Sequence, residues 1–223
     1  MSQRHQVLGI FAKQPIPGQV KTRLAKVTSP EWAARVAEAF LRDTLARLAT
    51  IPVRRVLAYA PEEAGANFAA LAGPDVTLVP QVGADLGERL SYFFLSQCEA
   101  GATATVVVGT DSPTLPVAWV EQAFAELEHA DIVLGPATDG GYYLIGIGER
   151  MPPIFDGVRW GTEQVLADTI ARLPADFRLA LLPPWYDVDS LADWQMLRGH
   201  LAAMLRAGMD PGLPRTIQVE DYS

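Results

Sequence analysis

The first thirty residues contain cationic side chains with a spacing that suits phosphate binding. All three lysines of the chain, Lys13, Lys21 and Lys26, lie here with Arg23, and every Lys or Arg beyond position 30 is an arginine. Residues 1–30 carry five cations and no acid (+5), and the other 193 carry 13 arginines against 26 acids (13 − 26 = −13), which together give −8. A lysine ammonium serves phosphate as a compact point charge. In the alternative interpretation, a general drift toward arginine left three lysines by chance.

The segment 13–23, KQPIPGQVKTR, follows an apolar run and is predicted to be a phosphate-binding loop. Its two prolines restrict the backbone, and Gly18 allows a turn or a close approach of the backbone to a ligand. Lys13, Lys21 and Arg23 would then supply the cations. The segment matches neither G-x-x-x-x-G-K-[ST] nor G-x-G-x-x-G. The alternative is a surface loop whose cations are merely solvated.

Aspartates follow two of the segments that read as strands. Asp111 comes just after the strongly apolar run 105–109, and Asp187 and Asp189 precede a predicted helix. In an extended stretch Asp187 and Asp189 project to the same side. Mg²⁺ is held by one or two carboxylates and keeps positions for phosphate oxygens and water. We therefore expect Asp111, with Asp189 as its preferred partner, to hold a divalent cation (Mg²⁺ or Mn²⁺). In the alternative interpretation these aspartates only form turns.

Composition limits the class of protein. A chain of 223 residues with 49% hydrophobic and 20% charged residues fits one globular domain with a sizeable core. No apolar run reaches the roughly 20 residues that span a bilayer, and the polar start predicts no signal peptide. The acidic balance disfavours nucleic-acid binding, which requires a basic face. The single cysteine, Cys98, indicates a cytoplasmic protein and is expected to be buried in an amphipathic helix.

Hydrophobic periodicity predicts an α/β protein. Strands are expected at 7–12, 53–60, 76–79, 105–109, 132–134, 142–147 and 178–182. Helices are expected at 30–49, 86–100, 116–127, 162–172 and 190–206, with N-caps at Ser29, Thr162 and Ser190. This alternation predicts a largely parallel sheet covered on both faces, with ligands beyond the carboxyl ends of its strands. Residues 209–223 are expected to form a C-terminal tail or the arm of a homodimer.

Six segments, which span nearly the whole chain in order, carry a resemblance to a known superfamily. They are FAKQPIPGQVKTRL (11–24), QVGADLGERL (81–90), VVGTDSPTLP (107–116), GPATDGGYYLIGI (135–147), RWGTEQVL (159–166) and DVDS (187–190). Together they resemble the GT-A-type nucleotide-diphospho-sugar transferase superfamily. Within it they most resemble the bacterial radical-SAM/selenodomain-associated transferases, also described as glycosyltransferases of arsenosugar biosynthesis. The organisation is also similar to that of the molybdenum-cofactor and phospholactate guanylyltransferases.

The resemblance implies a single GT-A domain over residues 1–223, a Rossmann-like three-layer sandwich with a mostly parallel mixed sheet. It implies a nucleotide over the carboxyl ends of the strands, with a divalent cation on its phosphates. The roles that it implies are phosphate binding by Lys21 and Arg23, metal binding by Asp111 and Asp189, base and ribose recognition by Gln81, Gly83 and Arg89, a floor under the sugar or acceptor from Asp139, Gly140 and Gly141, and an acceptor side from Trp160, Gly161 and Thr162.

Three functions remain open at this point. The first is metal-dependent glycosyl transfer from a nucleotide sugar to a small-molecule acceptor, with Asp139 as a candidate base from its placement alone. The second is nucleotidyl transfer from a nucleoside triphosphate to a phosphorylated acceptor. The third is a non-catalytic nucleotide-binding module. Many GT-A glycosyltransferases carry Asp-x-Asp, whereas here Asp111 is followed by Ser112 and Pro113. The run 139–141 is equally compatible with a hairpin turn.

Overall fold

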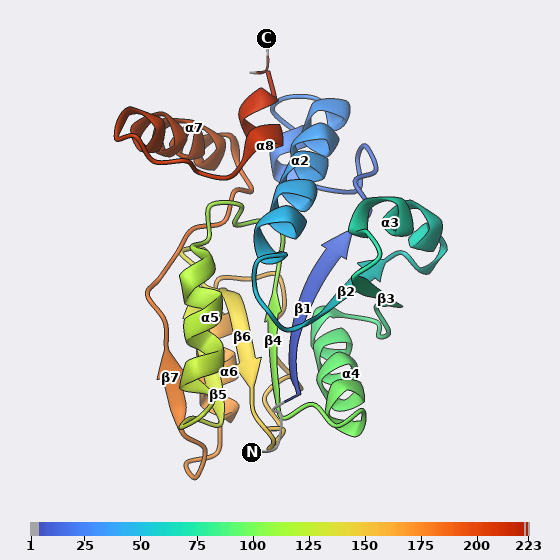
Figure 1. Ribbon diagram of the computed structural model, residues 1–223, viewed down its shortest axis with the longest axis vertical. Helices are drawn as coiled ribbons and strands as arrows, with labels where there is room; N and C mark the ends of the chain where they lie inside the picture. The colour runs from blue at the N-terminus through green and yellow to red at the C-terminus, as the bar shows by residue number, and fades with distance from the viewer. Residues whose placement is uncertain (1–4, 221, 223) are drawn as a thin grey trace.

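A seven-stranded mixed sheet forms the centre of the computed structural model, which describes residues 5–220 and 222 (Figure 1). The strand order is β3-β2-β1-β4-β6-β5-β7, and β6 alone runs antiparallel to its neighbours. The strands are β1 (Gln6–Lys13), β2 (Arg54–Ala60), β3 (Val76–Pro80), β4 (Ala104–Val108), β5 (Ile132–Pro136), β6 (Tyr142–Ile147) and β7 (Leu179–Leu181). The predicted α/β class and mostly parallel sheet are confirmed. Arg4 and, in the expected tail, residues 221 and 223 lie outside the described residues.

Helices connect most of these strands. The α-helices are α1 (Thr22–Ala25), α2 (Pro30–Leu48), α3 (Gly65–Ala72), α4 (Leu86–Glu99), α5 (Val117–Glu126), α6 (Val165–Arg172), α7 (Leu191–Arg206) and α8 (Pro214–Gln218), and a short 3₁₀ turn, η1, covers Glu62–Ala64. The predicted caps of α2 and α7 are confirmed: the Ser29 hydroxyl accepts from the Trp32 amide, and Ser190 forms a reciprocal capping box with Asp193. Within the described part of the chain, no helix combines the length and apolarity that crossing a bilayer requires.

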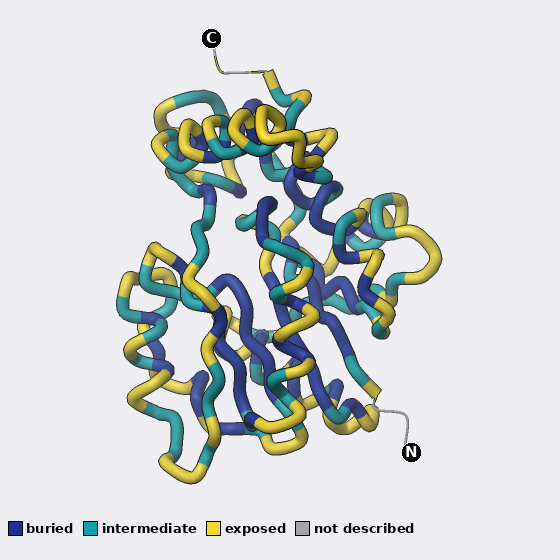
Figure 2. The backbone as a smooth tube through the Cα atoms, turned by 60° about the vertical axis from the view of Figure 1, so that its left-hand side comes forward, coloured by how far each residue is buried: buried dark blue, intermediate teal, exposed yellow. Residues whose placement is uncertain are grey.

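The sheet separates two apolar layers, and its strands are the most buried part of the chain (Figure 2). Side chains of α2, α3 and α5 pack on one face and those of α4 pack on the other. Strand β4 shows how one sequence serves both layers, because Val106 and Val108 face the first layer and Val107 faces the second. The pattern of the central strands therefore reads as a continuous apolar run.

A third apolar cluster lies beyond the carboxyl edge of the sheet, where α2, α7 and α8 come together (Figure 1). The rings of Trp32 and Trp194 meet edge to face at 5.1 Å in this cluster. The carboxylate of Asp43, 0% exposed, accepts a hydrogen bond from the Thr216 amide at 2.7 Å. Residues 213–218 thus fold back onto α2 instead of forming a loose tail, because an internal carboxylate receives the first amides of α8. A homodimer stays a prediction.

Three local expectations differ from the structure. Helix α6 begins at Val165 and not at Thr162, whose hydroxyl donates to the Arg159 carbonyl at 2.7 Å and so closes a turn before the helix. Cys98 is exposed. The inward position at the end of α4 belongs to Gln97, which is buried and accepts from Arg54 at 2.6 Å. Helices α1, α3 and α8 were not expected from the sequence.

Candidate active site

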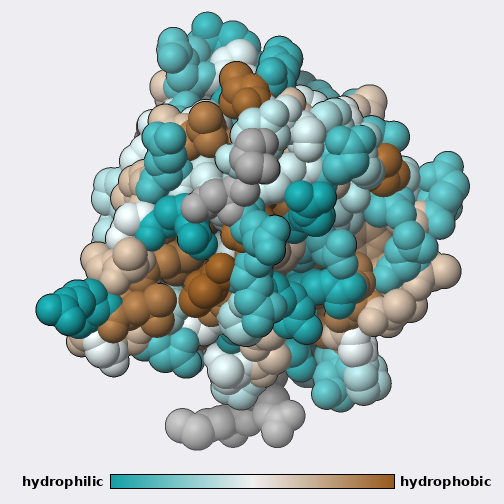
Figure 3. Space-filling model, turned by 90° about the horizontal axis from the view of Figure 1, so that it is seen from above, coloured by the Kyte–Doolittle hydropathy of each residue, from teal (hydrophilic) through white to brown (hydrophobic). Residues whose placement is uncertain are grey.

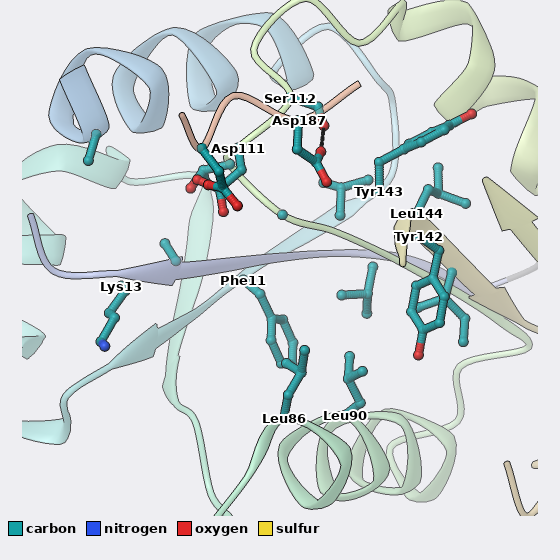
Figure 4. A pocket seen from close by; sticks show the side chains of 18 of the residues that line it. Phe11, Lys13, Leu86, Leu90, Asp111, Ser112, Tyr142, Tyr143, Leu144 and Asp187 are labelled. Carbon is teal, nitrogen blue, oxygen red and sulfur yellow. Dashed lines mark hydrogen bonds between the residues drawn. The ribbon is translucent and has the colours of Figure 1, made fainter. Parts of the chain in front are cut away.

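A pocket of about 360 Å³ opens at the carboxyl ends of β1 and β4. These strands are neighbours, but β1 continues to β2 on one side while β4 leads to β6 on the other. Such a reversal of strand order leaves a crevice where ligands of α/β proteins bind. Figure 4 shows its two ends: Asp111, Ser112 and Asp187 gather at one, and Phe11 and the α4 residues Leu86 and Leu90 line the other. The pocket therefore joins a charged end to an apolar one.

Lys21 occupies the centre of the charged end. Its ammonium donates to Asp111 Oδ1, to the Val188 carbonyl at 2.7 Å and to Asp189 Oδ1 at 3.2 Å. The three N–H groups of a lysine are thereby all engaged. The side chain is 3% exposed, and the ammonium lies 5.2 Å from the centre of the Phe40 ring. Lys21 thus joins the two predicted metal ligands from a loop to which the sequence gives a phosphate-binding role.

The backbone at Lys21 is in a conformation that L-residues avoid. Its φ of 47° and ψ of 43° make it the one non-glycine residue with positive φ in the described part of the chain. This left-handed conformation costs roughly 1–2 kcal/mol. The Val188 amide donates to the Asp111 carbonyl at 2.9 Å, so the two loops that carry the acceptors are tied to each other. These two tied loops supply all three acceptors of the Lys21 ammonium.

Charge and burial act in opposite directions on Lys21. Burial acts to lower its pKa, but the charges of Asp111 and Asp189 and their hydrogen bonds raise the pKa above its ordinary value. The group is therefore a permanent cation at neutral pH. The Asp111 and Asp189 side chains remain 55% and 38% exposed. Both carboxylates thus stay accessible from solvent while one oxygen of each faces the ammonium.

Asp187 is the remaining carboxylate among the described residues that line the pocket. The Ser112 hydroxyl donates to its Oδ1 (Figure 4). Burial raises the pKa of Asp187 to about 7; the Ser112 hydrogen bond lowers the pKa, and the charges of Asp111, Asp139 and Asp189 raise it further. Asp187 therefore exchanges its proton near neutrality. The prediction from the DVDS run singled out Asp189 and gave Asp187 no separate role.

The carboxylates fit a cation that arrives on phosphate better than a metal held by protein alone. Among the described residues, no group of three or more His, Cys, Asp or Glu side chains is arranged to hold a metal. Asp111 and Asp189, however, already converge on one cationic atom. Mg²⁺ is satisfied by one or two carboxylates when phosphate oxygens and water complete its shell. The donor set of Asp111 and Asp189 thus fits a metal–nucleotide.

The other cations of the predicted phosphate loop lie around this centre. Lys13 is exposed at the end of β1 and lines the pocket. Arg23 is 65% exposed, with a guanidinium nitrogen 3.9 Å from Asp189 Oδ2. Gly18 has a φ of 79° and open space where a Cβ would lie. The positive φ of the turn therefore favours glycine here, whereas no neighbouring atom is close enough to require it. Lys13 and Arg23, unlike Lys21, are free to turn toward a phosphate.

Gln81, Gly83 and Arg89 form one unit beside the pocket. The Gln81 amide, which lines the pocket, donates to the Ala58 carbonyl at 2.8 Å and to the Ala12 carbonyl at 3.2 Å. Arg89 Nε donates to the Gly83 carbonyl at 3.0 Å. A Cβ on Gly83, whose φ is 139°, would lie 2.7 Å from Glu88 Cβ. Gln81 thus contacts the pocket directly, whereas Gly83 and Arg89 shape the loop behind it.

The residues predicted for the acceptor side lie outside the pocket. Asp139 Oδ1 accepts from the Gly141 amide at 2.9 Å, which makes the hairpin turn. A Cβ on Gly140 would lie 2.2 Å from the Glu163 carbonyl oxygen, so this glycine allows two loops to pack. The Trp160 ring packs edge to face on Tyr142, which lines the pocket, at 6.4 Å. Of these residues, Trp160 thus packs behind the pocket wall.

Comparisons with known proteins give a family and a fold. Residues 44–162, just over half of the chain, match the family described as "Uncharacterized protein conserved in bacteria (DUF2064)". No curated protein matches the sequence. This protein is similar to a solved structure of a candidate nucleotide-diphospho-sugar transferase from Desulfovibrio desulfuricans G20. The two share 32% sequence identity and a TM-score of 0.85, and the match covers 98% of this chain and 100% of that chain.

Two more distant structures share the fold alone. The 4-diphosphocytidyl-2C-methyl-D-erythritol synthase of Anaerococcus prevotii has 8% identity and a TM-score of 0.60, over 89% of this chain and 96% of its own. A cytidylyltransferase of Leptospira borgpetersenii has 12% identity and a TM-score of 0.58, over 97% and 94%. The protein belongs to the bacterial DUF2064 family, and its single sheet has the fold of nucleotide-diphospho-sugar transferases.

Proposed function

We propose that this protein is a metal-dependent transferase that uses a nucleotide-activated sugar and releases the nucleoside diphosphate. The observation that carries the proposal is the convergence of Lys21, Asp111 and Asp189 at the crevice between β1 and β4. Cations that bind phosphate and carboxylates that bind Mg²⁺ or Mn²⁺ are both needed there, because a leaving diphosphate develops negative charge. The resemblance of the sequence motifs to sugar transferases favours glycosyl transfer.

In this proposal each pocket residue has a defined task. Lys13, Lys21 and Arg23 would bind the diphosphate, and Asp111 and Asp189 would hold the divalent cation, which would neutralise charge on the leaving group. The bond between the anomeric carbon and the diphosphate oxygen breaks, and an acceptor hydroxyl forms the new bond and loses its proton. Asp187 receives that proton, because it lines the pocket without contacting Lys21, whereas Asp139 lies in a turn outside it.

Nucleotidyl transfer is the second candidate. The observation in its favour is the single aspartate of the loop after β4, where Pro113 stands in the place of a second carboxylate. In that reaction a phosphorylated acceptor attacks the α-phosphorus of a nucleoside triphosphate and pyrophosphate leaves. The same cations and carboxylates serve both reactions, since positioning and charge neutralisation dominate phosphoryl chemistry.

A ligand screen separates these functions. Thermal unfolding is followed with nucleoside diphosphates, triphosphates and nucleotide sugars, each with and without Mg²⁺ or Mn²⁺. Metal-dependent stabilisation by one nucleotide sugar beyond that by its diphosphate supports glycosyl transfer, and the donor is then tested for transfer to small hydroxyl-bearing acceptors. Preferential stabilisation by a triphosphate supports nucleotidyl transfer. Stabilisation by none of them at millimolar concentration contradicts both and leaves a non-catalytic module.

A further inference from the structure

We propose that the ammonium of Lys21 closes the divalent-cation site of the free protein and leaves it only when phosphate oxygens replace its partners. The inference rests on the proposed function, because it concerns the same site. It gives Lys21 two successive positions, on the carboxylates first and on phosphate afterwards. It also predicts an order of binding, in which the metal enters as a complex with the nucleotide and binds poorly alone.

The contacts of Lys21 put its ammonium in competition with a divalent ion that would bridge the same two carboxylate oxygens. The ammonium lies between Asp111 Oδ1 and Asp189 Oδ1, the oxygens on which a bridging cation would converge. A divalent ion placed between them would meet a cation at contact distance, where like charges repel strongly in a poorly solvated site. The ammonium has no N–H left for a phosphate, since the Val188 carbonyl takes the third. Phosphate binding by Lys21 therefore requires that it release at least one carboxylate.

The loop has features that favour such a release. Lys21 has a left-handed backbone conformation, which L-residues adopt at a cost. Its long, flexible stem lets the ammonium move without the backbone following. Lys13 lines the pocket and Arg23 is largely exposed beside Asp189, so both side chains can attract the phosphates first. An incoming diphosphate thus supplies new acceptors for Lys21 as its metal takes the vacated oxygens.

The direct test is binding of Mn²⁺ alone, measured as free Mn²⁺ by electron paramagnetic resonance. Lys21→Met is expected to bind Mn²⁺ about tenfold or more tightly than the wild type, because a like charge at contact is removed together with the occupant. Arg23→Met is the matched control, since it deletes an equal charge near Asp189 without vacating the site. It should change affinity less than about threefold, because the exposed guanidinium is screened.

Two results of this titration overturn the proposal. Equal tightening in Lys21→Met and Arg23→Met means that charge alone matters and that Lys21 does not occupy the cation's place. Unchanged or weaker binding in a Lys21→Met protein that retains its cooperative thermal unfolding means that Lys21 is a permanent tie. The Mn²⁺ titration contains no nucleotide, so its result does not depend on which nucleotide the protein uses. A failure of the proposed function would instead be seen in the ligand screen, and the two failures can be told apart.

A second measurement follows the NMR signal of Lys21 in the protein with its native Lys21. It therefore does not depend on whether the Lys21→Met variant folds. The chain has only three lysines, so ¹³Cε labelling of lysine gives three methylene signals, which Lys13→Arg and Lys26→Arg assign. Mg²⁺ alone should leave the Lys21 signal in place, and Mg²⁺ with inorganic pyrophosphate should shift it. A shift with Mg²⁺ alone, or no shift with Mg²⁺ and pyrophosphate, overturns the proposal.

Discussion

The Ser112 hydroxyl donates a hydrogen bond to Asp187 across 75 residues of sequence. This bond ties the loop after β4 to the segment before α7, the two segments that carry all three pocket carboxylates. It also fixes Asp187 among the charges of Asp111 and Asp189. The pocket thus stores electrostatic repulsion that a cation or a proton relieves.

Asp187 should make the stability of the metal-free protein depend on pH. Its pKa of about 7 lies above the ordinary 3.8, so between these values the folded state holds a proton that the unfolded state has lost. The free energy of unfolding therefore falls as pH rises through this window. Asp187→Asn should lack this pH dependence. The free energy of unfolding of the variant minus that of the wild type should therefore be larger at about pH 8 than at about pH 5, by on the order of 2 kcal/mol. Urea unfolding with EDTA measures the difference, and an equal difference at both pH values contradicts it.

Asp43 should anchor the C-terminal helix. Its buried carboxylate accepts from the Thr216 amide at 2.7 Å and from the Arg215 amide at 3.3 Å. Asp43→Ala leaves both donors without this acceptor and should destabilise the protein by about 3 kcal/mol. Asp43→Asn, which keeps one acceptor oxygen, should cost less. Urea unfolding tests the ranking, and early proteolytic loss of α8 in Asp43→Ala is the accompanying observation. Equal stability of both variants and the wild type would refute the anchor.

Arg47 should hold the loop that carries Asp111. Its guanidinium, more than half buried, donates from α2 to the Pro113 carbonyl, and burial lowers its pKa despite the nearby charge of Asp43. Arg47→Met should destabilise the protein by about 2 kcal/mol and weaken nucleotide binding. Arg42→Met is the matched control on the same helix, since Arg42 forms an exposed pair with Glu38 at 2.8 Å and should change stability by less than about 0.5 kcal/mol. Identical effects of the two changes would show that the Pro113 contact is dispensable.

Two glycines of positive φ should respond differently to alanine. Gly18→Ala places its methyl in open space and should cost only the conformational strain, about 1 kcal/mol. Gly83→Ala adds a Cβ 2.7 Å from Glu88 Cβ and 2.8 Å from the Arg89 amide nitrogen, so it should cost more than about 2 kcal/mol. Thermal unfolding of the two variants tests this order. A reversed order would mean that the loop before α4 is not tightly packed.

Much of the fold follows from local sequence signals. The run of valines in β4 predicts a strand buried on both faces, and Ser190 with Asp193 predicts the start of α7. The prediction of a helix cap at Thr162 is wrong, because a threonine whose hydroxyl closes a turn cannot be distinguished by local sequence from one that caps a helix. Helix α3 carries a glycine at its start and lies in a segment without strong periodicity.

The residues proposed for the candidate site can be chosen from the sequence, but their pairing cannot. Lys21 and Asp111 were both assigned from local motifs, yet they are 90 residues apart, and nothing local tells that they bond to each other. Their contact depends on the adjacency of β1 and β4, which the strand order decides. Asp139 shows the converse, since its glycine neighbours suit a ligand site and a hairpin turn equally well, and here they form the turn.

In the proposed function, nucleotide phosphates and their metal bind at Asp111. The most direct measurement is calorimetric titration of the preferred nucleotide with Mg²⁺ into the wild type, Asp111→Asn and Asp139→Asn. Asp139→Asn removes the same charge in a turn outside the pocket and keeps an acceptor oxygen. Asp111→Asn should lose at least about tenfold in affinity, because a charged metal ligand is gone, while Asp139→Asn should bind like the wild type. Wild-type affinity in a folded Asp111→Asn protein would contradict the claim.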